Sequence, residues 1–362
     1  MSFAHGFSGL DRFLHRLAFG GTGLQMAVAD IEDRLYAGRY AGIAVDRPVF
    51  VTSLPRAGTT LLLEVLAAHP DFATHTYREM PFVLCPLMWH AVSRSFRQAG
   101  GARERAHGDG MTVDYDSVEA FEEIVWRAFW PEKYRPDRIA LWDADDIAAD
   151  DEFGPFIANH IRKLIALRRQ DGVAPHRYVS KNNANIARLP ALARLFPDAV
   201  ILIPFRNPID HVGSMLRQHR NFTKIHGEDD FARRYMQGIG HLEFGAALSP
   251  IDFGGWLDRA GVAPADGANY WLAYWCAAFE HVLEARPAAA RLVSYDACCR
   301  AAMDALGGIA AEVGVDDPEP LLRQAHRFRP PVGYDPDTLA GRRDLVDRAL
   351  ALHDRLRAAA IV

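Results

Sequence analysis

The chain lacks long apolar runs and is poor in cysteine, and these absences exclude several classes of protein. No stretch of the 362 residues approaches the length of a membrane span. The N-terminus has no basic start followed by an apolar core, as a secretory signal requires. The four cysteines have neither the spacing of metal ligands nor the density of a disulfide framework. We therefore expect a cytoplasmic protein with no membrane span and no metal site.

Excess charge of one sign is also missing. The formal net charge is −5 and 24% of the residues are charged, so composition gives no reason to expect attraction to nucleic acid. An apolar fraction of 49% is ample for a buried core, and no repeat or linker divides the chain. We predict one domain over residues 1–362, with an N-terminal helical segment at 1–47, a core at 48–335 and a C-terminal helix at 336–362.

The stretch around which the chain is organised combines a strand, a loop and a helix start. Residues 48–54 are rich in β-branched and aromatic side chains, a turn with Arg56 and Gly58 follows, and a leucine-rich helix opens at Thr59. Loop N–H groups and the free N–H groups of the first helical turn then point at one place, where the helix dipole adds positive charge. This arrangement predicts a phosphate site.

The loop departs from the Walker A motif in an informative way. That motif has Lys directly before Ser or Thr, so that the amine reaches the β- and γ-phosphates and the hydroxyl binds magnesium. Here Gly58 occupies the Lys position, and the cation is Arg56, which suits a bidentate grip on a terminal phosphate. A plain strand-to-helix turn is the alternative interpretation of the stretch.

Further apolar segments predict a parallel sheet. Residues 178–181 and 291–295 read as strands, and residues 199–205 form a continuous apolar run, as expected of a parallel strand covered on both faces. The pattern predicts an α/β fold with a P-loop-like, doubly wound parallel sheet flanked by helices. Glycine-rich segments at 100–115 and 225–268 are read as loop insertions, and the sequence leaves open whether they close over a substrate.

A second anion site is predicted where the run 199–205 ends. Arg206 leaves the carboxyl end of the strand, and Ser214 lies eight residues later in the helix that follows. A guanidinium fork and a hydroxyl can converge there on one phosphate. The alternative is an arginine that only caps the edge of the sheet.

Acidic residues gather in two places and favour structural interpretations. A helix around residues 118–130 is read as a packed helix with a solvated acidic edge. The acidic run at 143–152 is read as a solvated loop or a helix-start signal, because no histidine stands at ligand spacing beside it.

Both phosphate stretches resemble those of the sulfotransferase superfamily that uses 3′-phosphoadenylyl sulfate (PAPS). Pro55-Arg56-Ala57-Gly58-Thr59-Thr60-Leu61 is similar to its 5′-phosphosulfate loop, and the pair Arg206 and Ser214 resembles its 3′-phosphate motif. Ser180-Lys181-Asn182-Asn183 resembles a turn of the tyrosylprotein and bacterial members, although those members commonly continue with Asp-Pro or Thr-Pro after the lysine. The resemblance is therefore nearer to these members than to the cytosolic animal enzymes.

The resemblance also implies roles for single residues. Arg56, Ala57, Gly58, Thr59, Thr60, Arg206, Ser214 and Tyr295 would bind the nucleotide, and Lys181 would offset charge on the leaving group. Animal cytosolic members take the acceptor's proton with a histidine of a Lys-Thr-His turn, which this chain lacks. Tyrosylprotein and many bacterial members use a glutamate shortly after the first helix, where Glu79 stands, and His75 is the competing candidate.

The implied reaction is direct, in-line transfer of a sulfuryl group from PAPS to a hydroxyl or amine, with release of 3′,5′-ADP and no metal requirement. The acceptor would be a small molecule, a lipid or a glycan. Two alternatives stay open: a P-loop kinase-like phosphotransferase and a non-catalytic nucleotide-binding module. The sequence gives neither the acceptor's identity nor the oligomeric state.

Overall fold

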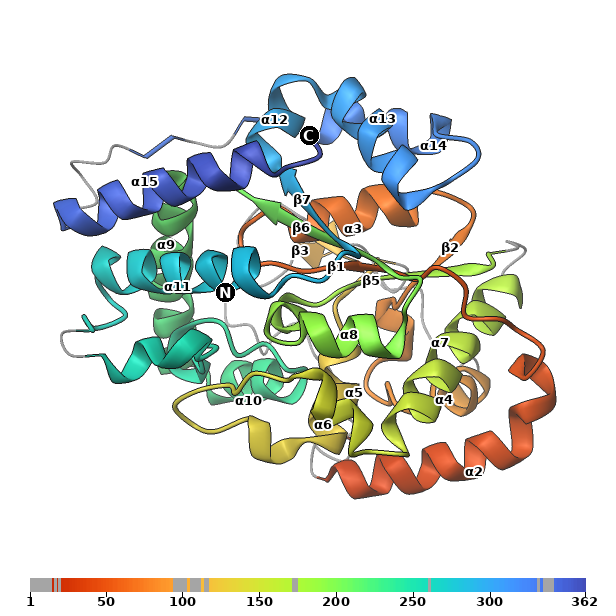
Figure 1. The fold of residues 1–362 in the computed structure, drawn as a ribbon. Coiled ribbons are helices and arrows are strands. Elements are labelled where there is room, and N and C mark those ends of the chain that lie inside the picture. Colours follow the sequence, from red (N-terminus) through yellow and green to blue (C-terminus); the bar gives the residue numbers. More distant parts are fainter. Residues whose placement is uncertain are drawn as a thin grey trace.

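One parallel sheet lies at the centre of the computed structural model, which describes residues 15, 18, 21–93, 103–104, 112–113, 117–170, 175–259, 262–330, 333–334 and 342–362 (Figure 1). Five strands run in the order β2-β5-β1-β6-β7, and every neighbouring pair is parallel. The strands are β1 (Val49–Val51), β2 (Phe72–Ala73), β5 (Arg177–Lys181), β6 (Val200–Phe205) and β7 (Ala290–Ser294). A separate antiparallel pair joins β3 (Arg103–Glu104) and β4 (Thr112–Val113). The predicted α/β class with a doubly wound parallel sheet is confirmed.

The strands bury both faces, which explains their continuous apolar runs. In β1, Val49 and Val51 belong to the apolar cluster on one side of the sheet, and Phe50 belongs to the cluster on the other. In β6, Leu202 and Ile203 divide in the same way. Because successive side chains of a strand point to opposite faces, such strands form only where helices cover both sides.

Helices therefore form a layer on each side of the sheet (Figure 1). The first layer contains α3 (Thr59–Ala67), α12 (Tyr295–Arg300), α13 (Ala302–Val313) and α14 (Glu319–Leu322). The second layer contains α5 (Glu122–Phe129), α7 (Phe153–Gln170), α8 (Leu189–Leu195), α9 (Pro208–Glu228), α11 (Ala268–Ala285) and α15 (Arg343–Ala358). From β1 the chain runs to β2 at one edge and back to β5, whereas from β6, on the other side of β1, it runs outward to β7. The winding therefore reverses between β1 and β6. Open α/β sheets bind ligands at such a point.

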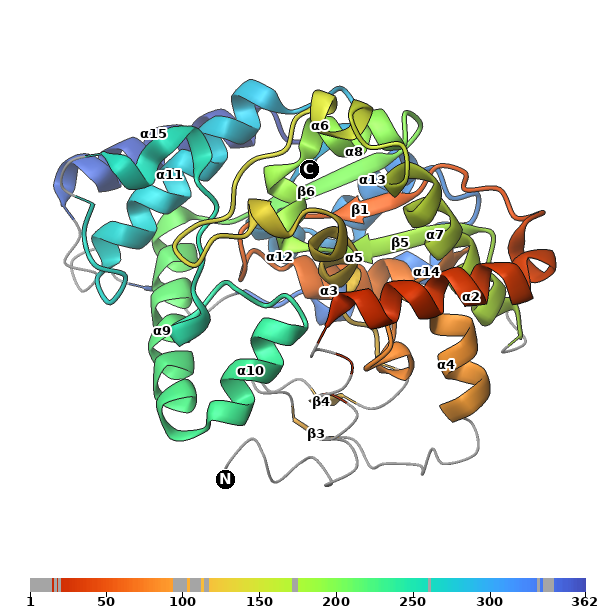
Figure 2. The same ribbon diagram turned by 90° about the horizontal axis from the view of Figure 1, so that it is seen from below.

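Peripheral helices extend the second layer (Figure 2). They are α2 (Thr22–Tyr40), which packs on α7, together with α4 (Pro86–Ser93), α6 (Ala144–Ala148) and α10 (Asp230–Gly238). Short 3₁₀ turns are η2 (Tyr77–Glu79), η3 (Pro131–Lys133), η4 (Asn183–Ala187), η5 (Gly245–Ala247), η6 (Phe253–Asp258) and η7 (Ala325–Arg327). No helix within the described ranges is both long and apolar enough to cross a bilayer.

The segment 225–268 is more regular than the glycine count suggested. Helix α9 continues through Gly227 to Glu228, and α10 follows at once because the Asp229 side chain accepts hydrogen bonds from the N–H groups of Phe231 and Ala232. Glycine frequency alone therefore misled the interpretation. Most of the segment 100–115 lies outside the described residues, as does the first part of the N-terminal helical segment. The prediction of a single domain stays a prediction.

The acidic run at 143–152 marks helix starts, which was one of the two interpretations of the sequence. Asp143 accepts hydrogen bonds from the N–H groups of Asp145 and Asp146, and Asp146 returns a bond to the Asp143 N–H, which makes a capping box at α6. Asp150 accepts from the N–H of Phe153 at the start of α7. These carboxylates stabilise helix N-termini, and no cluster of metal-ligating side chains occurs among the residues that the structure describes.

Candidate active site

The loop between β1 and α3 has the backbone of an anion site. Gly58 precedes the first helical residue with φ of 94°, and no side chain caps the N-terminus of α3. Arg56 also has a positive φ, 74°, which is uncommon for a residue other than glycine. A Cβ on Gly58 would lie 2.4 Å from Cδ2 of Tyr295, so only glycine fits beneath that ring. The uncapped N–H groups of the first turn are thus left for a ligand.

The predicted second phosphate site lies against this loop. Nη1 of Arg206 donates to the carbonyl oxygen of Arg56 at 3.0 Å, and Nε of Arg56 donates to Oγ of Ser214 at 3.4 Å. Nε of Arg206 is buried and makes no hydrogen bond within the described residues. A buried donor without an acceptor costs free energy unless a ligand supplies one. The three side chains predicted to hold phosphates therefore converge from the loop after β1, the end of β6 and helix α9.

A buried histidine that sequence reasoning missed holds the loop in place. The indole N–H of Trp275 can only donate, so Nδ1 of His211 is the acceptor of their 3.1 Å hydrogen bond. The proton therefore lies on Nε2, which donates to the carbonyl oxygen of Pro55 at 2.8 Å. Burial, with the nearby positive charge of Arg206, lowers the pKa of His211 to about 3. The ring stays neutral and fixes the direction of the Pro55 carbonyl.

Two tyrosine rings lie against the residues that are predicted to bind phosphate. Tyr295 follows β7, covers Gly58 and lies 5.5 Å from the Arg206 guanidinium, measured to the ring centroid. Burial raises the pKa of its hydroxyl to about 12. Tyr334 packs on Gly213, where an added Cβ would lie 2.5 Å from Cδ1, and its hydroxyl is buried without a partner in the described part of the chain. Tyr295 thus contacts the start of α3, and Tyr334 contacts α9 next to Ser214, so each ring lies beside predicted anion-binding groups.

Lys181 reaches the same site through the register of the sheet. It pairs with Val51 across the β1–β5 ladder, so the lysine at the end of β5 lies beside the residue from which the anion loop departs. Lys181 is largely buried and lines a pocket together with Pro55 of the loop. The structure therefore brings it to the edge of the sheet that also carries Arg56 and Arg206.

The two asparagines after Lys181 explain why this turn departs from the family pattern. Asn182 caps η4 by accepting from the N–H of Ala184, and its amide Nδ2 donates to Glu123 at 2.7 Å. Asn183 accepts from the Thr59 hydroxyl at 3.1 Å through Oδ1 and donates through Nδ2 to Oε1 of Glu243 at 2.9 Å. Each amide therefore uses both ends, which neither Asp-Pro nor Thr-Pro could do.

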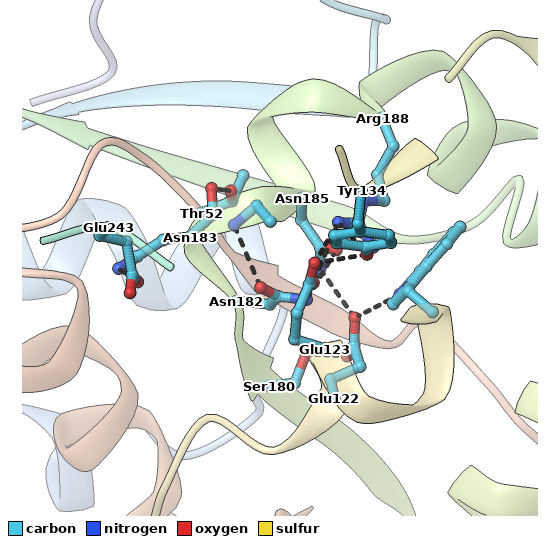
Figure 3. Close-up of polar contacts among 12 residues, drawn as sticks. Thr52, Glu122, Glu123, Tyr134, Ser180, Asn182, Asn183, Asn185, Arg188 and Glu243 are labelled. Carbon is cyan, nitrogen blue, oxygen red and sulfur yellow. Dashed lines mark hydrogen bonds and ion pairs between the residues drawn. The ribbon is translucent and has the colours of Figure 1, made fainter. Parts of the chain in front are cut away.

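The expected solvated acidic edge of the helix at 118–130 is wrong, because Glu119, Glu122 and Glu123 are all buried. Glu122 and Glu123 are bonded to residues at and around the Lys181 turn (Figure 3). Glu122 accepts from the Ser180 hydroxyl at 2.5 Å and from Nδ2 of Asn185 at 2.8 Å. Glu123 accepts from Asn182 and from the guanidinium of Arg188 at 2.9 Å. Two glutamates of helix α5 thus hold the turn in place through hydrogen bonds.

Arg188 completes this buried network. Its guanidinium lies 4.3 Å from the ring centroids of both Trp126 and Trp142, and the side chain is fully buried. Nη2 bonds both carboxylate oxygens of Glu123, and the hydroxyl of Tyr134 also donates to that carboxylate at 2.5 Å. A buried charge is tolerated because an opposite charge and two aromatic faces surround it.

The two predicted proton acceptors are buried and already bonded. Both oxygens of Glu79 are engaged: Oε1 by Arg168 at 2.8 Å and Oε2 by the N–H and hydroxyl of Thr76. Nε2 of His75 lies 3.2 Å from Nε2 of His160, and burial lowers the pKa of His75 to about 3. Neither lines the pocket beside Lys181.

That pocket opens between the Lys181 turn and the segment 240–251. It spans about 530 Å³ of space, a volume that includes open solvent at its mouth. Its apolar walls come mainly from the segment 240–251 and from Tyr274 of α11, and its polar groups include Lys181, Asn183 and Glu243. Within the segment 225–268, the part after α10 thus forms a wall of the pocket.

Comparisons with known proteins agree with this geometry. The profile of the Sulfotransferase family matches residues 48–244, more than half of the chain. The chain belongs to this family, and membership indicates a transferase that moves sulfuryl groups.

Two solved structures are similar over most of the chain. Sulfotransferase STF1 of Mycobacterium tuberculosis has 16% identity and a TM-score of 0.51, covering 96% of this chain and 87% of that one. Sulfotransferase STF9 of Mycobacterium avium has 16% identity and a TM-score of 0.49, covering 90% of this chain and 80% of that one. The likeness to STF1 shows a shared fold. No curated protein matches the sequence.

The structure brings the residues predicted to bind the nucleotide together, whereas sequence reasoning missed the groups that hold them. Arg56, Gly58, Arg206, Ser214 and Tyr295 come together, with Lys181 beside them. Glu79 and His75 lie apart from the pocket, and their predicted roles stay predictions. The missed supports, such as His211 and Glu123, contact partners distant in sequence. The double asparagine after Lys181 was the one local signal for them.

Proposed function

We propose that the chain is a PAPS-dependent sulfotransferase that transfers the sulfuryl group to a hydroxyl or amine. The observation that carries the proposal is the contact of two anion-binding groups. An uncapped helix start and Arg56 suit the 5′-phosphosulfate, and Arg206 with Ser214 suits a 3′-phosphate. The unused buried Nε of Arg206 fits a ligand oxygen, and the glycine beneath Tyr295 leaves the loop close to that ring.

In this proposal the chain works by positioning and by charge. Loop N–H groups and Arg56 hold the phosphosulfate, while Arg206 and Ser214 fix the 3′-phosphate. Lys181 offsets the negative charge that grows on the bridging oxygen as the S–O bond breaks. Fixed dipoles and cations in a partly enclosed site stabilise such charge without reorganising. The pocket beside Lys181 receives the acceptor.

The acceptor must also lose a proton, and the sequence resemblance suggests Glu79 or His75 as the base. Glu79 would have to leave Arg168 and Thr76 before it could take a proton. His75 would have to leave His160, and its low pKa makes it a weak base. Glu79→Gln and His75→Ala test the two directly: the residue whose loss leaves the transfer rate unchanged is not the base.

Isothermal titration separates this proposal from its rivals. We expect 3′,5′-ADP to bind more tightly than ATP with magnesium, and Arg206→Ala to weaken 3′,5′-ADP by about tenfold or more, since hydrogen bonds to charged groups contribute about 1.5–3 kcal/mol. Arg343→Ala removes an exposed guanidinium far along the chain and serves as the matched control. A preference for ATP with magnesium would favour the kinase-like alternative. Binding of 3′,5′-ADP without transfer of labelled sulfate from PAPS would favour the non-catalytic module.

A further inference from the structure

Glu243 is a carboxylate of the pocket to which the predicted mechanism gives no role. It is half-buried and lines the pocket with Lys181 and Asn183. Its Oε1 accepts from Nδ2 of Asn183 at 2.9 Å, and its Oε2 makes no hydrogen bond within the described residues. In Figure 3 it lies on the other side of the Asn182–Asn183 turn from Glu122 and Glu123.

Asn183 fixes Glu243 relative to the anion loop. The Thr59 hydroxyl donates to Oδ1 of Asn183, so the amide presents Nδ2 to the carboxylate. A flipped amide would place its carbonyl oxygen against Glu243, where two acceptors repel each other. The backbone carbonyl of Asn183 also accepts from the Thr52 hydroxyl at 3.3 Å, which ties the residue to the end of β1. One hydrogen-bonded chain therefore runs from the first residue of α3 to Glu243.

The other carboxylates near the site are already engaged. Glu123 also lines the pocket, but Arg188, Tyr134 and Asn182 all bond to it. Glu79 is held by Arg168 and lies outside the pocket wall. Only Glu243, among the carboxylates that line the pocket, keeps one oxygen for a ligand while the other is oriented by a side chain. An oriented base with a free face toward the substrate is the arrangement that proton abstraction needs.

We propose that Glu243 takes the proton of the acceptor, an inference that rests on the proposed sulfotransfer. As the acceptor oxygen attacks, a new S–O bond forms and the bond between sulfur and the bridging phosphate oxygen breaks. The acceptor's proton passes to Oε2 of Glu243, and the electron pair of the broken bond leaves with 3′,5′-ADP. Lys181, which lines the same pocket, would offset the charge on the leaving group. Asn183 is a positioning residue, which holds the base at a fixed place relative to the loop.

The test compares Glu243→Gln with Glu79→Gln and with Glu132→Gln, an exposed control. Labelled PAPS is offered with one of two phenols as the acceptor, unsubstituted phenol or 4-nitrophenol. Water is a third acceptor, because it is present in every assay. A positioned general base contributes about 10²- to 10⁴-fold, so we expect Glu243→Gln to lower kcat with phenol and with water by a factor in this range. The defect should shrink with 4-nitrophenol at mildly alkaline pH, where that phenol is already ionised. Glu243→Asp should restore part of the rate.

Two readouts keep the outcomes apart. Affinity for 3′,5′-ADP should match the unaltered chain in Glu243→Gln, which shows that the fold and donor site are intact. The acid limb of the pH–rate profile should flatten in this variant and persist in Glu132→Gln. Full activity of Glu243→Gln, or a defect equal for both phenols, overturns the assignment. If the unaltered chain neither binds 3′,5′-ADP nor releases sulfate from PAPS, the proposed function itself fails, and the assignment fails with it.

Discussion

Replacing Arg188 by methionine should destabilise the fold strongly, although the residue lies outside the predicted donor site. The guanidinium is fully buried between Trp126 and Trp142 and pairs with the buried carboxylate of Glu123. Breaking a buried pair by removing one partner costs about 3–5 kcal/mol, because the other charge stays buried without a counter-charge. The hydroxyl of Tyr134 and the amide of Asn182 would still bond to Glu123 but cannot neutralise it.

The double variant Glu123→Gln/Arg188→Met shows whether the cost arises from the unpaired charge. Without either charge, the site contains a neutral amide beside an apolar side chain, and we expect the double variant to be more stable than Arg188→Met alone. Coupling between contacting residues is usually about 0.5–3 kcal/mol, and this pair should reach the upper part of that range. Urea unfolding followed by circular dichroism gives the free energies, with Arg234→Met, in an exposed pair, as the unaffected control.

Arg188→Met should also slow the reaction, because it disturbs the Lys181 turn. Glu123 accepts from Asn182, so a displaced carboxylate loosens the turn that follows Lys181. We expect kcat to fall while affinity for 3′,5′-ADP changes little, since the predicted 3′-phosphate residues follow β6 and lie on α9. The reasoning is refuted if Arg188→Met loses less than about 1 kcal/mol, or if the two single changes simply add in the double variant.

Two further outcomes follow from the loop and its supports. Gly58→Ala should lower stability by about 1–3 kcal/mol and weaken the affinity for 3′,5′-ADP at least tenfold, because φ is positive and the added Cβ would clash with Tyr295. Gly227→Ala, with open space around the added Cβ, should have neither effect. Burial lowers the pKa of His211 from 6.5 to about 3, so the unfolded chain binds more protons between these values and stability is lost as pH falls through that window. Urea midpoints over this range should fall less steeply for His211→Gln, and an unchanged slope contradicts the assignment.

The sheet and the anion loop could be predicted because their signals are local. Residues 199–205 carry an apolar run that only a strand covered on both faces explains, and β6 spans Val200–Phe205. Arg56, Gly58 and Thr59 follow β1 without interruption, so the strand and the helix start fix the place of the loop. Sequence order was enough to place these groups at one edge of the sheet.

The buried acids could not be predicted, because their partners are far away in the sequence. Glu122 and Glu123 read as a solvated edge, and a charged residue is indeed rarely buried without partners. Their hydrogen-bond partners Ser180, Asn185 and Arg188 lie 58 to 65 residues later in the sequence. Only the folded chain reveals such pairing. The pairing also distinguishes Glu243, which keeps one oxygen without a hydrogen bond to any described residue, from the other carboxylate of the pocket.

Arg56 shows how a binding site can conflict with the stability of its own backbone. A left-handed conformation costs a residue with a Cβ about 1–2 kcal/mol, and glycine at this position would avoid that cost. Under the proposed function, binding of the phosphosulfate by the Arg56 guanidinium would compensate for this cost. The loop would then give up part of its folding stability in exchange for affinity for the donor.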